Sequence, residues 1–209
     1  MTSTQIQPTP ADAWARLAAG NKRFTAGTPD HPNQGADRRE YLQDQQHPFA
    51  MLFGCSDSRV AAELIFDVGL GDMFVVRTAG QVADTGVMGT LEYGVDILDI
   101  PLLVVLGHDE CGAVTAARDT ILSGTSPGGF MSDLVARILP NVLTAQKDGV
   151  DPADINSMVA VHTKHTAELL PERSLSLRAA VDAGRLAIAG VTYSLRDGEA
   201  HVVTTIGNL

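Results

Sequence analysis

The chain has 209 residues, of which 44% are hydrophobic, and carries a formal net charge of −10. This length and apolar content are sufficient for one well-filled α/β domain. The negative charge argues against nucleic acid as a partner, because phosphate binding needs basic patches. No apolar run approaches the roughly 20 residues that a membrane span requires, and the polar start, residues 1–10, lacks the features of a secretory signal. We therefore expect a cytoplasmic protein that binds neither nucleic acid nor membrane.

The first expected element is a helix that begins after Thr9. Thr9 is expected to cap it, with Pro10 at the first helical position and Asp12 returning its carboxylate to the cap. The apolar stripe of this helix fades near Gly27, and a loop follows. Residues 1–35 thus form a helical arm that is too small for its own core. It is expected to pack on the body of the protein or on a partner subunit.

Strands and helices alternate through the rest of the chain. The expected strands cover residues 49–54, 73–77, 102–107, 186–193 and 201–206, the last two joined by a tight turn at Asp197-Gly198. The expected helices cover 60–66, 87–98, 113–122 and a region from 131 to about 170, broken at Pro140 and restarted after Pro152. This order predicts a single α/β domain over 1–209, with about four parallel strands and an antiparallel edge strand, flanked by helices.

The two cysteines of the chain each belong to a short polar motif that follows an expected strand. Cys55 begins the motif CSDSR, and Cys111 ends the motif HDEC, which starts at His108. In open parallel sheets, ligands collect beyond the carboxyl ends of the strands. Two thiolates, one imidazole and one carboxylate form a set suited to zinc. Cys55, Asp57, His108 and Cys111 are therefore the candidate ligands of one zinc ion per chain.

Asp57 has two rival partners, the metal and Arg59. Three protein ligands plus solvent leave a zinc site open for catalysis, whereas a fourth protein ligand closes it. Arg59, two residues further on, can hold the carboxylate in a bidentate pair. We expect this competition to switch the site between closed and open forms. A helix start expected after each motif would favour the thiolate forms of the cysteines.

Other interpretations of these residues are simpler. The zinc site could be purely structural, although such sites usually use Cys₄ or Cys₂His₂ ligands. The turn from Cys55 to Arg59 resembles a cysteine-phosphatase loop but is too short for a phosphate cradle, and the sequence distance between the cysteines excludes a thioredoxin-like pair. His162 and His165, at i and i+3 of an expected helix, are half of a second metal site, surface histidines or a proton relay.

From its N-terminal helix to its end, the chain resembles the β-class carbonic anhydrases. The motif CSDSR, the motif GHDECG at 107–112 and the segment FVVRTAG at 74–80 all recur at that family's positions. The resemblance implies that Cys55, His108 and Cys111 bind zinc. It makes Asp57 either the fourth ligand or, paired with Arg59, the partner of the zinc-bound hydroxide.

The resemblance also assigns residues outside the two cysteine motifs. Gln46 matches a glutamine that donates a hydrogen bond to substrate from the neighbouring subunit, which implies a homodimer or a tetramer of dimers. Some bacterial members hold an inhibitory bicarbonate with a tryptophan, an arginine and a tyrosine. Arg77 and Tyr193 match the last two, but Leu52 replaces the tryptophan, which weakens the case for such inhibition. Thr78 stands where many members carry asparagine.

The function implied is the reversible hydration of CO₂ to bicarbonate and a proton, by attack of zinc-bound hydroxide on carbon. Asp57 and Arg59 would orient the hydroxide, and Gln46 would donate to a substrate oxygen. Because two thiolates donate more charge than imidazoles, activity is expected to rise toward mildly alkaline pH. The alternatives are hydrolysis of carbonyl sulfide or carbon disulfide, and a non-catalytic zinc protein. Four apolar residues are candidates for a pocket wall or for the core: Phe49, Phe66, Val82 and Val87.

Overall fold

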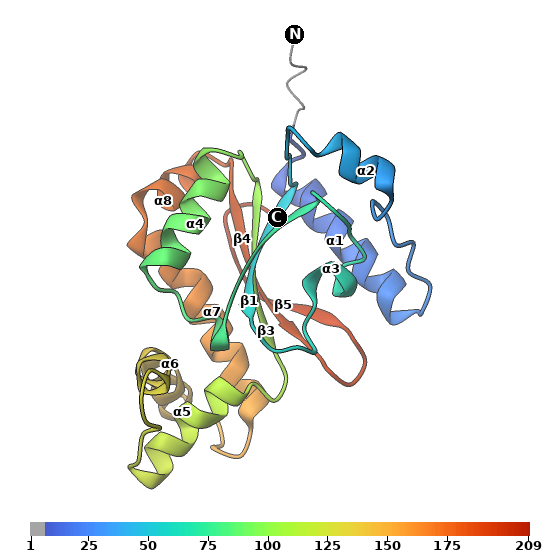
Figure 1. Ribbon diagram of the computed structural model, residues 1–209. Helices are drawn as coiled ribbons and strands as arrows, with labels where there is room; N and C mark the ends of the chain where they lie inside the picture. The colour runs from blue at the N-terminus through green and yellow to red at the C-terminus, as the bar shows by residue number, and fades with distance from the viewer. Residues whose placement is uncertain (1–6) are drawn as a thin grey trace.

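A five-stranded sheet between layers of helices forms the centre of the computed structural model, which describes residues 7–209 (Figure 1). The strands are β1 (Ala50–Cys55), β2 (Met73–Thr78), β3 (Leu102–His108), β4 (Ala187–Tyr193) and β5 (Ala200–Ile206). Their order is β2-β1-β3-β4-β5, in which the first four are parallel and β5 is antiparallel to β4. The mostly parallel sheet with an antiparallel edge is therefore confirmed.

The helices cover both faces of the sheet and one of its ends. They are α1 (Pro10–Thr25), α2 (Ala36–Tyr41), α3 (Ala62–Ile65), α4 (Thr85–Asp96), α5 (Gly112–Ser123), α6 (Met131–Lys147), α7 (Ile155–Arg173) and α8 (Leu175–Asp182), with a 3₁₀ turn η1 (Ala79–Gln81) after β2. Helices α1 and α3 lie on one face, α4 and α8 on the other, and α5 with α6 beyond the end of the sheet (Figure 1). None of the helices among residues 7–209 has the length and apolar character that crossing a membrane demands.

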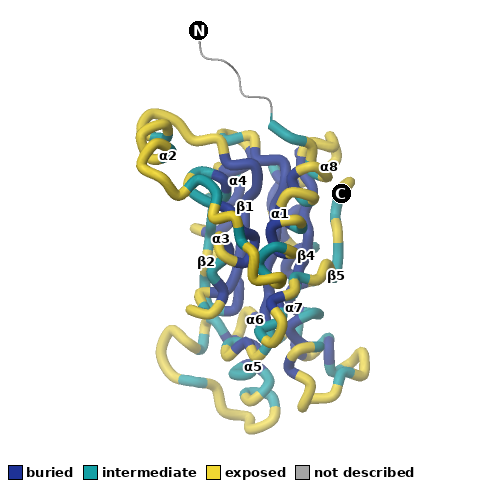
Figure 2. The backbone as a smooth tube through the Cα atoms, turned by 90° about the vertical axis from the view of Figure 1, so that its right-hand side faces the viewer, coloured by how far each residue is buried: buried dark blue, intermediate teal, exposed yellow. Residues whose placement is uncertain are grey.

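Alternating side chains of the strands fill two hydrophobic layers. From β1, Leu52 packs in the layer beneath α1 and α3, whereas Met51 and Phe53 pack in the layer beneath α4 and α8. Because successive strand side chains point to opposite faces, a strand buried on both faces reads as a continuous apolar run. Figure 2 shows the buried strands in dark blue within a more exposed shell. The four apolar candidates for a pocket wall are all buried in the core: Phe49, Phe66, Val82 and Val87.

A third hydrophobic cluster lies where α5, α6 and α7 pack together at the carboxyl ends of the parallel strands. It contains Val114, Ile138 and Met158, together with both cysteines, Cys55 and Cys111. The fold thus buries the two thiols in one cluster at the end of the sheet where the sequence predicted ligands to collect.

The N-terminal helix packs on the body of the same chain. Thr9 caps it by accepting a hydrogen bond from the backbone N–H of Asp12, as expected. Leu17 is fully buried against the sheet, and the Asn21 amide donates to the backbone oxygens of Ile65 and Gly198. Packing of this arm on a partner subunit stays a prediction. Residues 1–6, which belong to the expected arm and polar start, lie outside the described residues.

One local prediction was wrong, because helix α6 is not broken at Pro140. It continues through this exposed proline, since its buried residues Ile138 and Val142 form one apolar face on both sides of it. Helices α2 and α8 were not expected. The helix expected at 60–66 is the short α3, which begins three residues after the CSDSR motif ends at Arg59.

Candidate metal centre

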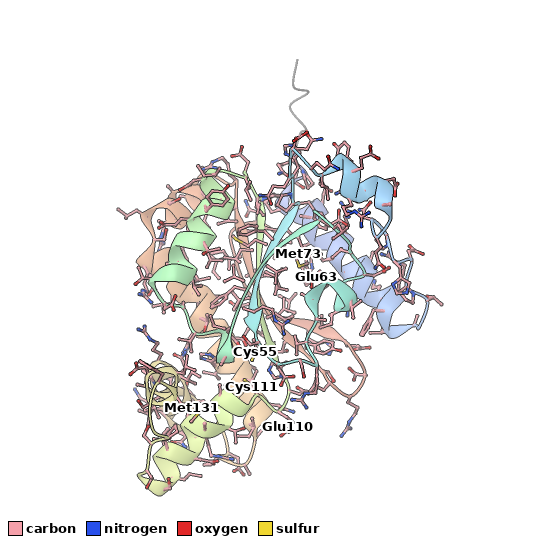
Figure 3. The ribbon with its side chains drawn as sticks, viewed as in Figure 1. Cys55, Glu63, Met73, Glu110, Cys111 and Met131 are labelled. Atoms are coloured by element: carbon pink, nitrogen blue, oxygen red, sulfur yellow. The ribbon has the colours of Figure 1, made fainter. Side chains whose placement is uncertain are left out.

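Cys55, His108 and Cys111 converge at the carboxyl end of the sheet. Cys55 ends β1, His108 ends the neighbouring strand β3, and Cys111 caps the start of α5. One ligand atom from each side chain lies within 4.8 Å of the others, and all three residues are buried. Figure 3 labels Cys55 at the lower end of the sheet and Cys111 just below it. No other group of three such ligands occurs within residues 7–209.

The imidazole of His108 presents a free lone pair to this cluster. Its Nδ1 lies 2.8 Å from the backbone oxygen of Asp109. Because a carbonyl oxygen only accepts, Nδ1 carries a proton, and in the neutral ring Nε2 is then the acceptor. Nε2 is buried and has no hydrogen-bond partner among residues 7–209. An unpaired buried acceptor is costly, so its position within 4.8 Å of two sulfur atoms is explained best by a metal ion.

The two sulfur atoms lie within 4.8 Å of each other and influence each other's ionisation. The contact with Cys111 lowers the pKa of Cys55, while the same contact, together with burial, raises the pKa of Cys111. The N–H of Gly80 also donates to the Cys55 sulfur, at 3.3 Å. A divalent cation would take both sulfurs as thiolates and displace their protons. Two thiolates and a neutral imidazole are a zinc donor set, so the residues present fit zinc.

Different groups favour the thiolate form of each sulfur. Cys111 stands at the N-terminus of α5, where the N–H groups of Ala113 and Val114 lower its pKa, but the contact with Cys55 and burial raise the pKa overall. Helix α3 begins only at Ala62, so the N–H of Gly80, and not a helix start, donates to the Cys55 sulfur.

Asp57 is held by Arg59 beside the cluster. The Arg59 side chain donates from Nε to Oδ1 at 3.0 Å and from Nη2 to Oδ2 at 2.8 Å, and its backbone N–H donates to Oδ1. This pairing holds the pKa of the Asp57 carboxyl well below its usual range. Oδ2 of Asp57 also lies 3.9 Å from Nε2 of His108. An ionised carboxylate therefore stands next to the unpaired lone pair, with Arg59 as its partner in this structure.

Arg77 braces the loop that carries Cys55 and Asp57. It donates from Nε to the backbone oxygen of Cys55 at 2.8 Å and from Nη2 to that of Asp57 at 2.6 Å. Tyr193, which matches the tyrosine of the family's bicarbonate pocket, and Leu52, which replaces its tryptophan, are both buried in the core. The guanidinium of Arg77 is thus used to fix the position of the metal-site loop, a role that the sequence did not indicate.

Gln46 is not brought together with the other predicted site residues. It lines a surface depression with His47 and Tyr93. Gln46 lies before the first residue of β1, whereas Cys55 is the last residue of that strand. Six residues of β1 span about 17 Å at about 3.3 Å per step. Within one chain, Gln46 therefore lies at the opposite end of the strand from the cysteine cluster.

The turn η1 and helix α7 contribute residues that the sequence did not single out for the site. Gly80 donates to Cys55, and the Thr78 hydroxyl closes the same turn by donating to the backbone oxygen of Val82 at 3.0 Å. His162, for which a surface position was one of three alternatives, is 2% exposed. Both its ring nitrogens have partners within the protein, at Gly80 and Asn141, so it does not form half of a second metal site.

Known proteins resemble this chain in both sequence and structure. The carbonic anhydrase family matches residues 50–200. Carbonic anhydrase 2 of Mycobacterium tuberculosis is 52% identical over 200 residues, which cover 96% of each chain. The β-carbonic anhydrase CcaA has a TM-score of 0.69 at 27% identity and covers 90% of this chain and 86% of its own. A tetrameric β-carbonic anhydrase of Sordaria macrospora, 21% identical, shares the fold with a TM-score of 0.67 over 92% of each chain. The chain therefore belongs to the β-carbonic anhydrase family.

Proposed function

We propose that this enzyme binds one zinc ion through Cys55, His108 and Cys111 and catalyses the reversible hydration of CO₂ to bicarbonate and a proton. The observation that carries the proposal is the buried Nε2 of His108, which has no hydrogen-bond partner within residues 7–209 and belongs to a group of ligand atoms, with the sulfurs of Cys55 and Cys111, that lie within 4.8 Å of one another. When bound there, zinc would act as a Lewis acid that makes water acidic enough to serve as a nucleophile.

Asp57 serves this reaction as a hydrogen-bond acceptor. Because Arg59 keeps its pKa low, the carboxylate stays ionised throughout the physiological pH range and does not donate a proton. The two donors of the guanidinium hold both carboxylate oxygens, which fixes the plane of the group beside the cluster. A fixed acceptor of this kind orients a polar hydrogen of the reacting species.

The same residue also gates the site. Asp57 Oδ2 lies close enough to His108 Nε2 that a change of rotamer would carry the carboxylate to the metal. In that form it would be the fourth protein ligand and would close the site. The bidentate pair with Arg59 favours the open form by competing for both oxygens.

Gln46 acts on substrate from a neighbouring subunit. Its position at the far end of β1 supports this proposal, because it lies too far from the metal residues of its own chain. Strand β2 is an edge strand of the sheet and is largely half-buried, so its free side suits contact with a second copy. Tyr93, 46% exposed beside Phe74, extends this surface. We therefore propose a homodimer or a tetramer of dimers, to which the N-terminal arm also contributes.

Replacing Asp57 by Ala tests the catalytic proposal. Turnover in a stopped-flow CO₂ hydration assay is expected to fall while zinc content stays at one per chain, because three ligands remain. Asp154→Ala is the matched control, since this carboxylate caps α7 instead of facing the cluster. If zinc content fell in step with activity, Asp57 would be a structural ligand. Parallel assays with CO₂ and carbonyl sulfide identify the preferred substrate.

Mixing two inactive variants tests the origin of Gln46. In a mixed dimer of Asp57→Ala and Gln46→Ala chains, one site would combine an intact Asp57 with the partner subunit's Gln46. Random mixing is expected to restore about one quarter of wild-type activity, because half of the dimers are mixed and each has one intact site. No recovery after mixing would mean that Gln46 acts within its own chain.

A further inference from the structure

His162 is joined to the metal centre through a single backbone residue. Its Nε2 lies 2.8 Å from the backbone oxygen of Gly80, and the N–H of Gly80 donates to the Cys55 sulfur at 3.3 Å. We propose that His162 is a positioning residue that holds Gly80 in place as a donor to the Cys55 thiolate and thereby raises the affinity of the site for zinc. The inference rests on the zinc site proposed above.

The hydrogen-bond partners of His162 determine which of its nitrogens carries a proton. Gly80 offers a carbonyl oxygen, which only accepts, so Nε2 must donate. Burial lowers the pKa of His162, so the ring is neutral and Nδ1 is an acceptor. The Asn141 amide nitrogen lies 2.8 Å from Nδ1 and donates to it. The Asn141 oxygen, 3.3 Å from Nδ1 of His165, is then free to accept from that ring. Both ring nitrogens of His162, and both the nitrogen and the oxygen of the Asn141 amide, thus have a hydrogen-bond partner of the correct kind.

The turn that His162 holds is strained. Gly80 has φ +62° and Gln81 has φ +40°, so two successive residues adopt left-handed conformations, which cost a non-glycine residue about 1–2 kcal/mol. Such a turn persists only when the surrounding structure fixes it. The hydrogen bond from His162 fixes Gly80. The side-chain amide of Gln81 donates to the Thr163 hydroxyl, which fixes Gln81. Both anchors come from α7.

Packing also restricts this turn, but on one side only. A Cβ atom added at Gly80 would lie 2.7 Å from Cβ of Ala113 and 2.8 Å from Cδ1 of Ile138. The side chains of Ala113 and Ile138 therefore lie so close to Gly80 that they prevent the turn from moving toward α5 and α6. They do not determine how its peptide groups are rotated, because only a hydrogen bond selects the direction of an N–H. His162 supplies the hydrogen bond to Gly80 on the side of α7.

Removing the donor while keeping the volume of the side chain separates positioning from packing. His162→Leu removes the N–H, whereas His162→Gln keeps an amide donor of similar reach. We expect His162→Leu to weaken zinc binding by about 10- to 100-fold, the usual effect of losing an outer partner of a ligand, and His162→Gln to retain most of it. Zinc affinity is measured by competition with a chromophoric chelator. The Co²⁺-substituted proteins report the Cys55 sulfur through their thiolate charge-transfer band, which should shift in His162→Leu alone.

Leu170→Ala is the control for a general loss of stability, because Leu170 is fully buried in α7 and belongs to a different cluster. It should lower thermal stability without changing zinc affinity. Equal zinc affinities of His162→Leu and wild type, or an equal loss in His162→Leu and Leu170→Ala, would overturn the proposal. A wild-type chain without stoichiometric zinc would instead refute the zinc site itself.

Chemical rescue provides a second test that does not depend on stability. A cavity of about 140 Å³ adjoins His162 and is lined by Gln81, Asn141 and Arg173, so the space left in His162→Ala is open to a small molecule. Added imidazole is expected to slow the loss of zinc from His162→Ala to excess chelator, with no effect on the wild type or on Leu170→Ala. Failure of imidazole to slow zinc loss from a folded His162→Ala protein would contradict the proposal.

Discussion

Two buried polar regions of this molecule differ in whether their groups find partners. Near the amino end of β2, Asp67 accepts hydrogen bonds from Arg23 and from the backbone N–H groups of Asp30 and His31. Asp72 beside it accepts from Arg16, Asn33 and the N–H of Gly69. At the other end of the sheet, His108 Nε2 has no partner within residues 7–209, and the sulfurs of Cys55 and Cys111 lie within 4.8 Å of it and of each other.

The difference separates a structural network from a binding site. The carboxylates of the first region, which we call the acidic anchor (Asp67 and Asp72), receive enough donors to offset the cost of burial. They fix the loop after α1 and thereby the N-terminal helix. At the candidate metal centre, three potential ligand atoms lie within 4.8 Å of one another, an arrangement that a cation would complete. A buried polar group without a partner is therefore the better guide to function in this fold.

The largest effect is expected from Cys111→Ser. A hydroxyl is a poor zinc ligand at neutral pH, and the change removes one of three protein ligands. Stoichiometric zinc and CO₂ hydration should both be lost, as measured by metal analysis and stopped-flow assay. Retention of one zinc per chain would show that Cys111 is not a ligand. Asp67→Asn in the acidic anchor is the matched control, because it lies away from the cluster and should retain zinc.

A smaller effect, on stability alone, is expected from that Asp67→Asn variant. The amide loses the charge that Arg23 pairs with, and it places an N–H₂ group where the loop N–H groups of Asp30 and His31 require an acceptor. Leaving buried groups unpaired should lower the free energy of unfolding by about 1–3 kcal/mol. Denaturant unfolding with zinc analysis measures both quantities. A loss of zinc without a loss of stability would contradict the division between the two regions.

The acidic anchor should also make stability sensitive to acid. Burial opposes ionisation of Asp67, but the N–H of Asp30, the Arg23 guanidinium and the N–H of His31 outweigh it and lower the pKa of the carboxyl. A lowered native pKa stabilises the fold above the unfolded value of about 3.9, and this stability is lost as pH falls below that value. Between pH 5 and 3, wild type should therefore lose more unfolding free energy than Asp67→Asn. If the unfolding free energies of wild type and Asp67→Asn changed equally with pH, the lowered pKa of Asp67 would be refuted as a source of stability.

The smallest effect is expected from Thr9→Ala at the start of α1. Thr9 accepts from the N–H of Asp12, and loss of such a cap costs about 1 kcal/mol. The thermal midpoint should fall slightly, with unchanged zinc content. An effect on CO₂ hydration larger than the effect on stability would indicate that the N-terminal arm contributes to the active site of a partner subunit.

The sequence predicted those features that depend on local pattern. Apolar runs located the strands, the turn at Asp197-Gly198 located the hairpin, and the two cysteine motifs located the group of side chains that could bind a metal. Helix α6 could not be read correctly, because packing of Ile138 and Val142 overrides the local effect of Pro140. The contact between His162 and Gly80 joins residues 82 positions apart, so no local pattern indicates it.

The most direct test of the metal centre is zinc K-edge X-ray absorption of the purified protein, combined with metal analysis. We predict one zinc per chain with two sulfur ligands at about 2.3 Å and the remaining ligands nitrogen or oxygen at about 2.0–2.2 Å. A spectrum without sulfur ligands, or a protein without stoichiometric zinc, would contradict the proposed site at Cys55, His108 and Cys111.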